Sequence, residues 1–152
     1  PNLDKPLDEI TEIDIDEVAL IPENYIQDIN QRLIMYKKIA NSETSEQLDK
    51  IVLELINRFG NIPVETSNLI DITKMKIKYS KIGIKKLNIN KKILRITFQD
   101  DAQINNEKLI MFINSSRANV SFTKENVLLY RKNFEDIRDK KIVITNIIKK
   151  IT

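Results

Sequence analysis

Apolar residues recur at helical spacing soon after the start of the chain. From about Asn24 onward they fall three or four positions apart, as expected for a helix with one buried side. The pattern predicts a helix that ends near Asn41 and buries Ile26, Ile29, Leu33, Tyr36 and Ala40.

A second helix has clear signals at both ends. Thr44 and Gln47 match a capping box, in which each side chain accepts a hydrogen bond from a free backbone N–H at the helix start. Gly60 follows the last apolar position and is typical of a left-handed C-terminal cap. The stripe predicted to be buried comprises Leu48, Ile51, Val52, Leu55, Ile56 and Phe59.

A third helix is predicted from Pro63 to about Lys81, since proline suits the first turn of a helix. Gly83 then marks its end. The chain contains only two glycines, and both follow helical patterns. We therefore interpret them as helix caps and expect no glycine-rich nucleotide loop.

Beyond Gly83 the apolar period changes to two, which indicates strands. One hairpin is predicted around Asn90-Lys91 and another around 124–126, with a helix from about Asn105 between them. A last helix is predicted from about Glu135 to Ile151. The order predicts an α+β fold, in which N-terminal helices precede a small antiparallel sheet of two hairpins with intervening and C-terminal helices.

Charge divides the chain unevenly. The net charge of +3 combines −8 over residues 1–30 with +11 over the remainder. We interpret residues 1–20 as an acidic linker or edge segment, in which Ile13 and Ile15 alternate with polar residues, and residues 21–152 as one domain. The chain begins with Pro1, so we expect it to be a piece of a larger protein.

Composition excludes several kinds of chemistry. The sequence has no cysteine and no histidine, which removes thiolate nucleophiles, imidazole triads and most zinc sites. Ser115-Ser116 has no neighbouring base, Asp100-Asp101 fits a turn, and Glu135, Asp136 and Asp139 suit the start of the last helix. We expect no catalytic set, metal or cofactor in this domain. No apolar run approaches the length of a membrane span.

One stretch is strongly basic. Between residues 74 and 95 there are nine cations and no acid. A solvated surface is one interpretation, and a surface that binds nucleic-acid phosphates is the other. The candidate residues are Lys74, Lys76, Lys78, Lys81, Lys85, Lys86, Lys91, Lys92 and Arg95.

A more specific polar group lies near the end of the second helix. Glu54, Asn57 and Arg58 are three and four positions apart, so they share one side of the helix. They form either an exposed pair within the helix or a polar patch presented to a partner. Spacing alone leaves both interpretations open.

Several segments in order resemble one family. They are Ile21 to Ile26, Arg32-Leu33 with 36–40, Glu54 to Gly60 with Pro63, and then 69–72 and 81–84. Together they resemble the C-terminal domain of the bacterial transcription-repair coupling factors (Mfd), over about residues 20–150.

The resemblance implies a parent that is an ATP-dependent DNA translocase, with ATP and magnesium in its motor domains. Such a parent displaces stalled RNA polymerase from duplex DNA in the bacterial cytoplasm and recruits UvrA. The final domain of the family is not catalytic. It docks on the UvrB-like N-terminal module of the same parent and masks the surface that UvrA binds. The isolated domain is expected to be a monomer.

The resemblance also implies a docking contact. In the family a Glu and an Asp, three positions apart, meet arginines on the UvrB-like module, and the matching positions here are Glu54 and Asn57. Glu54 fits the pattern and Asn57 departs from it. We expect Glu54 to carry more of the contact, and we expect the face that includes Glu54 and Asn57 to be exposed when the domain is isolated.

Overall fold

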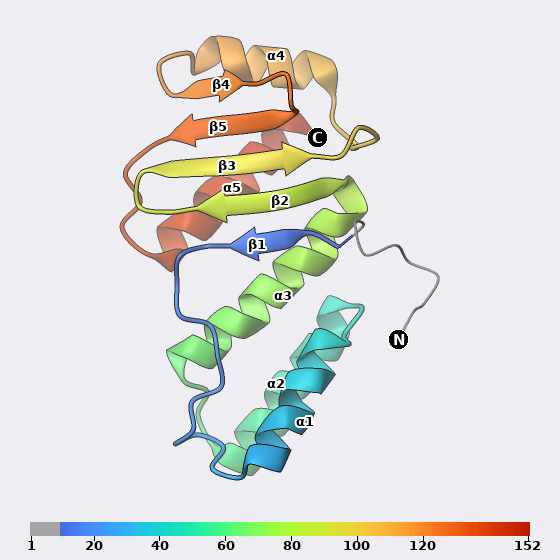
Figure 1. Ribbon diagram of the computed structural model, residues 1–152, viewed down its shortest axis with the longest axis vertical. Coiled ribbons are helices and arrows are strands. Elements are labelled where there is room, and N and C mark those ends of the chain that lie inside the picture. Colours follow the sequence, from blue (N-terminus) through green and yellow to red (C-terminus); the bar gives the residue numbers. More distant parts are fainter. Residues whose placement is uncertain (1–9) are drawn as a thin grey trace. The chain divides into compact units, whose positions relative to one another are not determined.

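Residues 10–152 are described by the computed structural model, and they divide into two units (Figure 1). Residues 17–78 form one, named here the helical unit, and residues 10–16 with 79–152 form the other, named the sheet unit. Residues 1–9 of the predicted acidic segment lie outside the described residues.

The helical unit contains α1 (Ile29–Ala40), α2 (Ser45–Phe59) and most of α3 (Val64–Ile82), whose last turn is counted in the sheet unit. Leu48 and Leu55 of α2 and Met35 of α1 are fully buried in its core. Partly buried aromatic residues, Tyr25, Tyr36 and Phe59, pack around that core. The second and third helices are confirmed.

The ends of α2 are built as the sequence predicts. The Thr44 hydroxyl accepts a hydrogen bond from Gln47 N at 3.1 Å, and the Gln47 side chain accepts one from Glu43 N at 2.7 Å. Gly60 has a φ of +88°, which an L side chain rarely adopts. Gly83, at +96°, ends α3 in the same way.

The predicted buried side of the first helix is only partly right: Ile26 is buried and Tyr36 is partly buried, but other predicted positions are exposed. The helix begins at Ile29, with Asp28 as its N-cap, and buries Met35 and Ile39. Ile29 and Leu33 are exposed at 60% and 50%. The reason is that α1 is apolar on more than one side, so tertiary contacts select the stripe that is buried. Ala40 and, on α2, Ile56 were also predicted to be buried and are exposed.

Within residues 10–152, five strands form one sheet in the order β1-β2-β3-β5-β4. They are β1 (Glu12–Asp14), β2 (Ile84–Ile89), β3 (Ile93–Phe98), β4 (Val120–Phe122) and β5 (Val127–Arg131). Both predicted hairpins are confirmed, and antiparallel pairing of β3 with β5 joins them. The short edge strand β1 runs parallel to β2, so the sheet is mixed rather than purely antiparallel.

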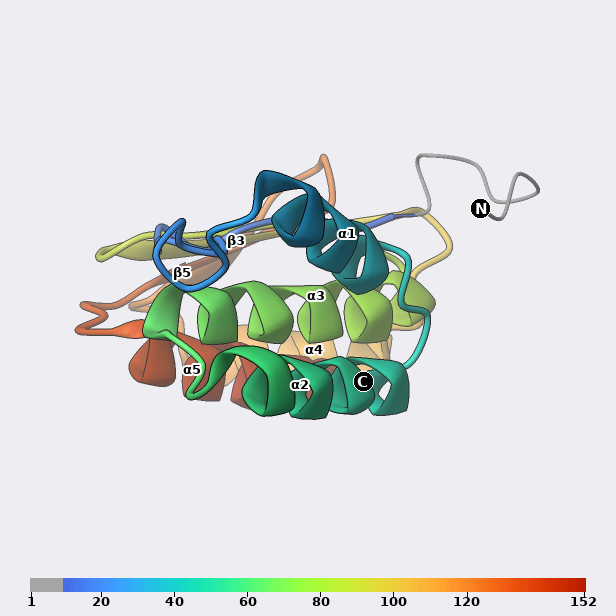
Figure 2. The ribbon, with the colours of Figure 1, turned by 90° about the horizontal axis from the view of Figure 1, so that it is seen from below.

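The helices α4 (Asn106–Ser115) and α5 (Ile137–Ile151) cover one side of this sheet (Figure 2). Leu94, Ile96 and Leu128 point to the covered side and are fully buried. The Phe112 ring of α4 lies 6.3 Å from the ring of Tyr130 on β5. Residues that alternate with these strand positions are partly or fully exposed on the other side of the sheet, where polar Asn88 and Arg95 lie among apolar Ile93 and Leu129.

A buried lysine attaches the β1 segment to α5. Lys140 is only 2% exposed, and its Nζ donates hydrogen bonds to Ile15 O at 2.8 Å and Asp16 O at 3.4 Å. The Thr11 hydroxyl, also buried, donates to Ile84 O at 2.6 Å. These buried bonds attach residues 11–16 to the rest of the sheet unit, from which residues 17–78 separate them in sequence.

Candidate functional site

Glu54 lies at the centre of a charged group that links α1 to α2. Its Oε1 accepts a hydrogen bond from Lys38 Nζ at 3.0 Å, and its Oε2 accepts one from Arg58 Nη1 at 2.8 Å. Arg58 is one turn further along α2, whereas Lys38 lies on α1. The single carboxylate therefore binds a cation from each helix.

Arg58 is held by three different groups. Besides Glu54, it contacts Gln31 of α1, whose Oε1 accepts a hydrogen bond from Nη2. Its guanidinium carbon also lies 4.9 Å from the centroid of the Phe59 ring, a cation–π distance. Arg58 is thus firmly placed. We name Gln31, Lys38, Glu54 and Arg58 the Glu54 cluster.

The C-terminal end of α2 is itself well anchored. The Phe59 ring packs edge-on against the Tyr25 ring at 5.9 Å, and the Tyr25 hydroxyl donates to Gly60 O at 2.8 Å. Partial burial of that hydroxyl raises the pKa of Tyr25 above its ordinary value. These contacts fix the turn of helix that carries Arg58.

Hydrogen bonds from Lys38, and then from Arg58, hold the pKa of the Glu54 carboxyl below its ordinary value. The Glu54 side chain is 30% exposed, and those of Lys38 and Arg58 are more exposed still. Each ion pair is therefore worth only about 0–1 kcal/mol, because water screens it. With two cations and one anion, the Glu54 cluster carries a net charge of +1.

Exposed aliphatic side chains accompany the cluster. Ile34 shares one side of α1 with the cluster residues Gln31 and Lys38, and it is 50% exposed. On α2, Leu53 is 61% exposed and lies one turn before Asn57. The Asn57 amide is exposed and makes no hydrogen bond within residues 10–152. We name the Glu54 cluster with Ile34, Leu53 and Asn57 the docking face.

Of the residues predicted from sequence, Glu54 and Arg58 form an ion pair and Asn57 lies beside them without joining it. Asn57 and Arg58 are exposed, whereas Glu54, which was also expected to be exposed, is only partly so. Sequence reasoning missed Lys38 and Gln31. No spacing rule could find them, since they reach α2 only through the packing of two helices.

Apolar area rimmed by polar residues is one arrangement found where proteins bind partners. Within residues 10–152 there is no group of three acidic, histidine or cysteine side chains that could hold a metal ion. In the same residues, no helix is long and apolar enough to cross a membrane.

The nine cations of the basic stretch are divided between the two units. Lys74, Lys76 and Lys78 lie on α3 within the helical unit, and Lys74 Nζ pairs with Asp49 at 2.7 Å. The other six belong to the sheet unit: Lys81 in the last turn of α3, Lys85 and Lys86 on β2, Lys91 and Lys92 in the β2–β3 turn, and Arg95 on β3.

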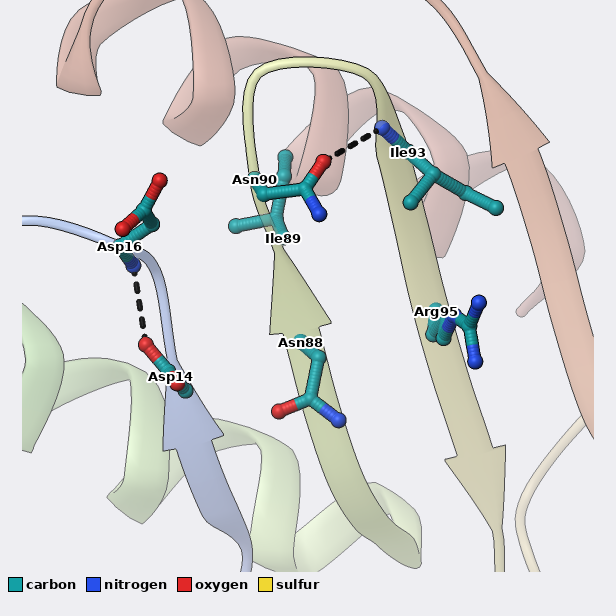
Figure 3. A pocket seen from close by; sticks show the side chains of 7 residues that line it. All are labelled: Asp14, Asp16, Asn88, Ile89, Asn90, Ile93 and Arg95. Atoms are coloured by element: carbon teal, nitrogen blue, oxygen red, sulfur yellow. Dashed lines mark hydrogen bonds between the residues drawn. The ribbon is translucent and has the colours of Figure 1, made fainter.

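Arg95 lines a shallow depression of about 360 Å³ on the open side of the sheet (Figure 3). Asp14 lies in the same row across the sheet, with Asn88 between them. Asp16 and Asn90 complete the polar wall, and Asp16 N donates to Asp14 Oδ1 at 3.0 Å. The lining of this depression therefore combines one cation with two carboxylates, so it is not a purely cationic surface for phosphate groups.

Comparison with known proteins gives consistent results. The sequence model of the TRCF domain matches residues 15–109. The chain is 42% identical over 109 residues to a transcription-repair-coupling factor of Buchnera aphidicola, which covers 72% of this chain. It is 36% identical over 110 residues to that of Escherichia coli, again over 72% of the chain.

The chain spans 13% of the length of the Buchnera protein and 10% of the Escherichia coli protein. Its fold resembles a crystal structure of the C-terminal domain of a transcription-repair coupling factor, with a TM-score of 0.74. That match covers 86% of this chain and 84% of the other at 20% identity, so it supports the fold.

Proposed function

The chain belongs to the TRCF domain family, the C-terminal domain of transcription-repair coupling factors, and we propose that it is the autoinhibitory domain of its parent. It docks on the UvrB-like N-terminal module of the same parent through the docking face. In that position it masks the surface that UvrA binds. The domain itself has no catalytic role.

The observation that supports this proposal is the make-up of the docking face. Glu54 presents a carboxylate on the helix that carries the family motif, while Ile34 on α1 and Leu53 on α2 expose apolar area. Apolar area supplies binding free energy, while the carboxylate selects a cationic partner. Arginines on the UvrB-like module are the cations that the family resemblance implies.

Asn57 makes this contact weaker than an acid would. An amide oxygen can still accept a hydrogen bond from an arginine, but without the attraction of a negative charge. A neutral hydrogen bond is worth about 0.5–1.5 kcal/mol, against about 1.5–3 kcal/mol for a charge-assisted one. Glu54 therefore carries most of the polar attraction.

The remaining roles belong to the parent. We propose that it translocates on duplex DNA using ATP and magnesium in its motor domains, displaces stalled RNA polymerase and recruits UvrA. It acts in the bacterial cytoplasm, and the isolated domain is monomeric. These activities follow from family membership alone.

The test is a calorimetric titration of this chain with the separately produced UvrB-like module, at about 50 and 200 mM salt. We expect binding that UvrA competes away and that changes little with salt. Glu54→Arg should weaken it roughly tenfold or more, because like charges then face each other. The control is Glu46→Arg, which reverses an exposed charge at the other end of α2.

A nucleic-acid-binding module is the alternative, and duplex DNA titrated in parallel tests it. Phosphate contacts from six to nine of these nine cations would weaken binding by roughly 10³–10⁵ over that salt range. DNA binding of that kind, without module binding, would overturn the docking proposal. It would instead assign DNA binding to the basic stretch from Lys74 to Arg95.

A further inference from the structure

The two cations that pair with Glu54 are held very differently. Arg58 contacts Glu54, Gln31 and the Phe59 ring, so it keeps two partners if the carboxylate turns away. Among residues 10–152, by contrast, the Lys38 ammonium bonds only the two Glu54 oxygens, at 3.0 and 3.2 Å. Its side chain is 45% exposed, so water can readily replace that contact.

Both carboxylate oxygens of Glu54 are already occupied. Lys38 Nζ bridges them, and Arg58 takes one as well. An incoming guanidinium needs the same pair of oxygens to bind in the bidentate geometry that makes such contacts strong. One of the resident cations must then move. Lys38 is the one that gives up fewer contacts, because Arg58 also holds Gln31 and the Phe59 ring.

We propose that Lys38 is an internal competitor for the Glu54 carboxylate, which weakens docking of a cationic partner and so keeps the docked state easy to release. This inference rests on the proposed docking function and adds its regulation. Docking exchanges the Lys38–Glu54 pair for a partner–Glu54 pair, so the net gain is only the difference between two exposed ion pairs. Undocking restores the internal pair, which lowers the free energy of the released state.

The test compares Lys38→Met with the unchanged chain in the same titration against the UvrB-like module. Methionine keeps much of the length of the side chain and removes the ammonium. Because an exposed ion pair contributes about 0.2–1 kcal/mol, we expect binding tighter by a factor of about 1.4 to 5. Lys37→Met is the matched control, since it removes the same charge from an exposed neighbour that does not pair with Glu54 within residues 10–152.

A double-mutant cycle separates competition from general repulsion. In a Glu54→Gln background the carboxylate is gone, so adding Lys38→Met should give no further gain. An equal gain from Lys37→Met, or a gain that persists without the carboxylate, would assign the effect to net charge and overturn the inference.

The remaining outcomes are also decisive. If the module binds and Lys38→Met binds no tighter, the competitor role is wrong while the docking function stands. If neither the unchanged chain nor any variant binds the module, both proposals fail together.

A second measurement needs no partner. Lys38 is the main cause of the lowered pKa of Glu54, so carbon-detected NMR titration of Lys38→Met should show that pKa returning toward its ordinary value. A pKa that stays unchanged would mean that Lys38 does not engage Glu54 in solution, and would overturn the inference independently.

Discussion

The helical unit and the sheet unit differ in how many large apolar side chains they leave exposed. Among residues 10–152, twelve large apolar side chains are exposed, and eight of them belong to the helical unit. These eight are Val18, Leu20, Ile29, Leu33, Ile34, Leu53, Ile56 and Val64. The sheet unit instead covers the apolar side of its strands with its own two helices.

This difference indicates where each unit can gain free energy by binding. The strands and helices of the sheet unit already bury apolar side chains against each other, so a partner there would meet a sheet surface on which polar residues lie among a few partly exposed apolar ones. The helices α1 and α2 bury one stripe each and keep aliphatic residues on their outer sides. An incompletely covered helix layer is what a docking domain requires.

The largest effect should come from the core of the helical unit. Leu55→Ala removes a fully buried side chain, while Leu53→Ala removes the same atoms from a position 61% exposed on the same helix. We expect a loss of about 2–5 kcal/mol in the free energy of unfolding for Leu55→Ala. For Leu53→Ala we expect a change within about 0.5 kcal/mol.

Urea unfolding followed by circular dichroism measures both variants. Leu53→Ala should also weaken module binding, although it leaves stability intact. Similar losses of stability at the two positions would contradict the separation between the buried and the outward sides of α2.

The next effect concerns the sheet unit. Lys140→Met should lower the free energy of unfolding by about 1–3 kcal/mol, since Ile15 O would lose its buried donor. Hydrogen exchange of residues 11–16 should speed up as well, because Lys140 holds that segment on the sheet unit. Lys149→Met, which changes an exposed lysine of the same helix, is the control. A Lys140→Met protein as stable as the control would show that burial of the charge costs as much as its hydrogen bonds contribute.

A smaller effect is expected from restoring the family acid. Asn57→Asp turns a neutral acceptor into a charged one, a difference of about 1–1.5 kcal/mol, so module binding should tighten roughly five- to tenfold. Asn61→Asp adds the same charge at an exposed position just beyond α2 and should have little effect. Unchanged or weaker binding by Asn57→Asp would remove this position from the docking face.

The smallest effect is a pH dependence of stability. Because the folded-state pKa of Glu54 is lowered by Lys38 and Arg58, its ion pairs stabilise the fold above the unfolded-state pKa, about 4.3. That contribution is lost as pH falls through the lowered folded-state value. The difference in unfolding free energy between the unchanged chain and Glu54→Gln should therefore be constant from pH 6 to about 5 and shrink below about pH 4. If the difference in unfolding free energy stayed constant down to about pH 3, the ion pairs of Glu54 would not stabilise the fold.

Much of the fold follows from signals that act within four residues. The capping box at Thr44, the glycine caps at Gly60 and Gly83, and the turn at Asn90 each determine their own backbone through a local hydrogen bond or a permitted φ. Periodicity placed the helices and hairpins for the same reason, since an element's own period decides its type. The sequence alone also determined the family, through several short motifs in a particular order.

Tertiary structure decided everything that depends on which surfaces meet. It selected Met35 and Ile39 as the buried side of α1, added β1 as a parallel edge strand, and paired β3 with β5. It also brought Lys38 to Glu54 and buried Lys140 against the β1 segment. These contacts join residues far apart in sequence, and no local pattern encodes such pairs because their free energy exists only once the elements have packed.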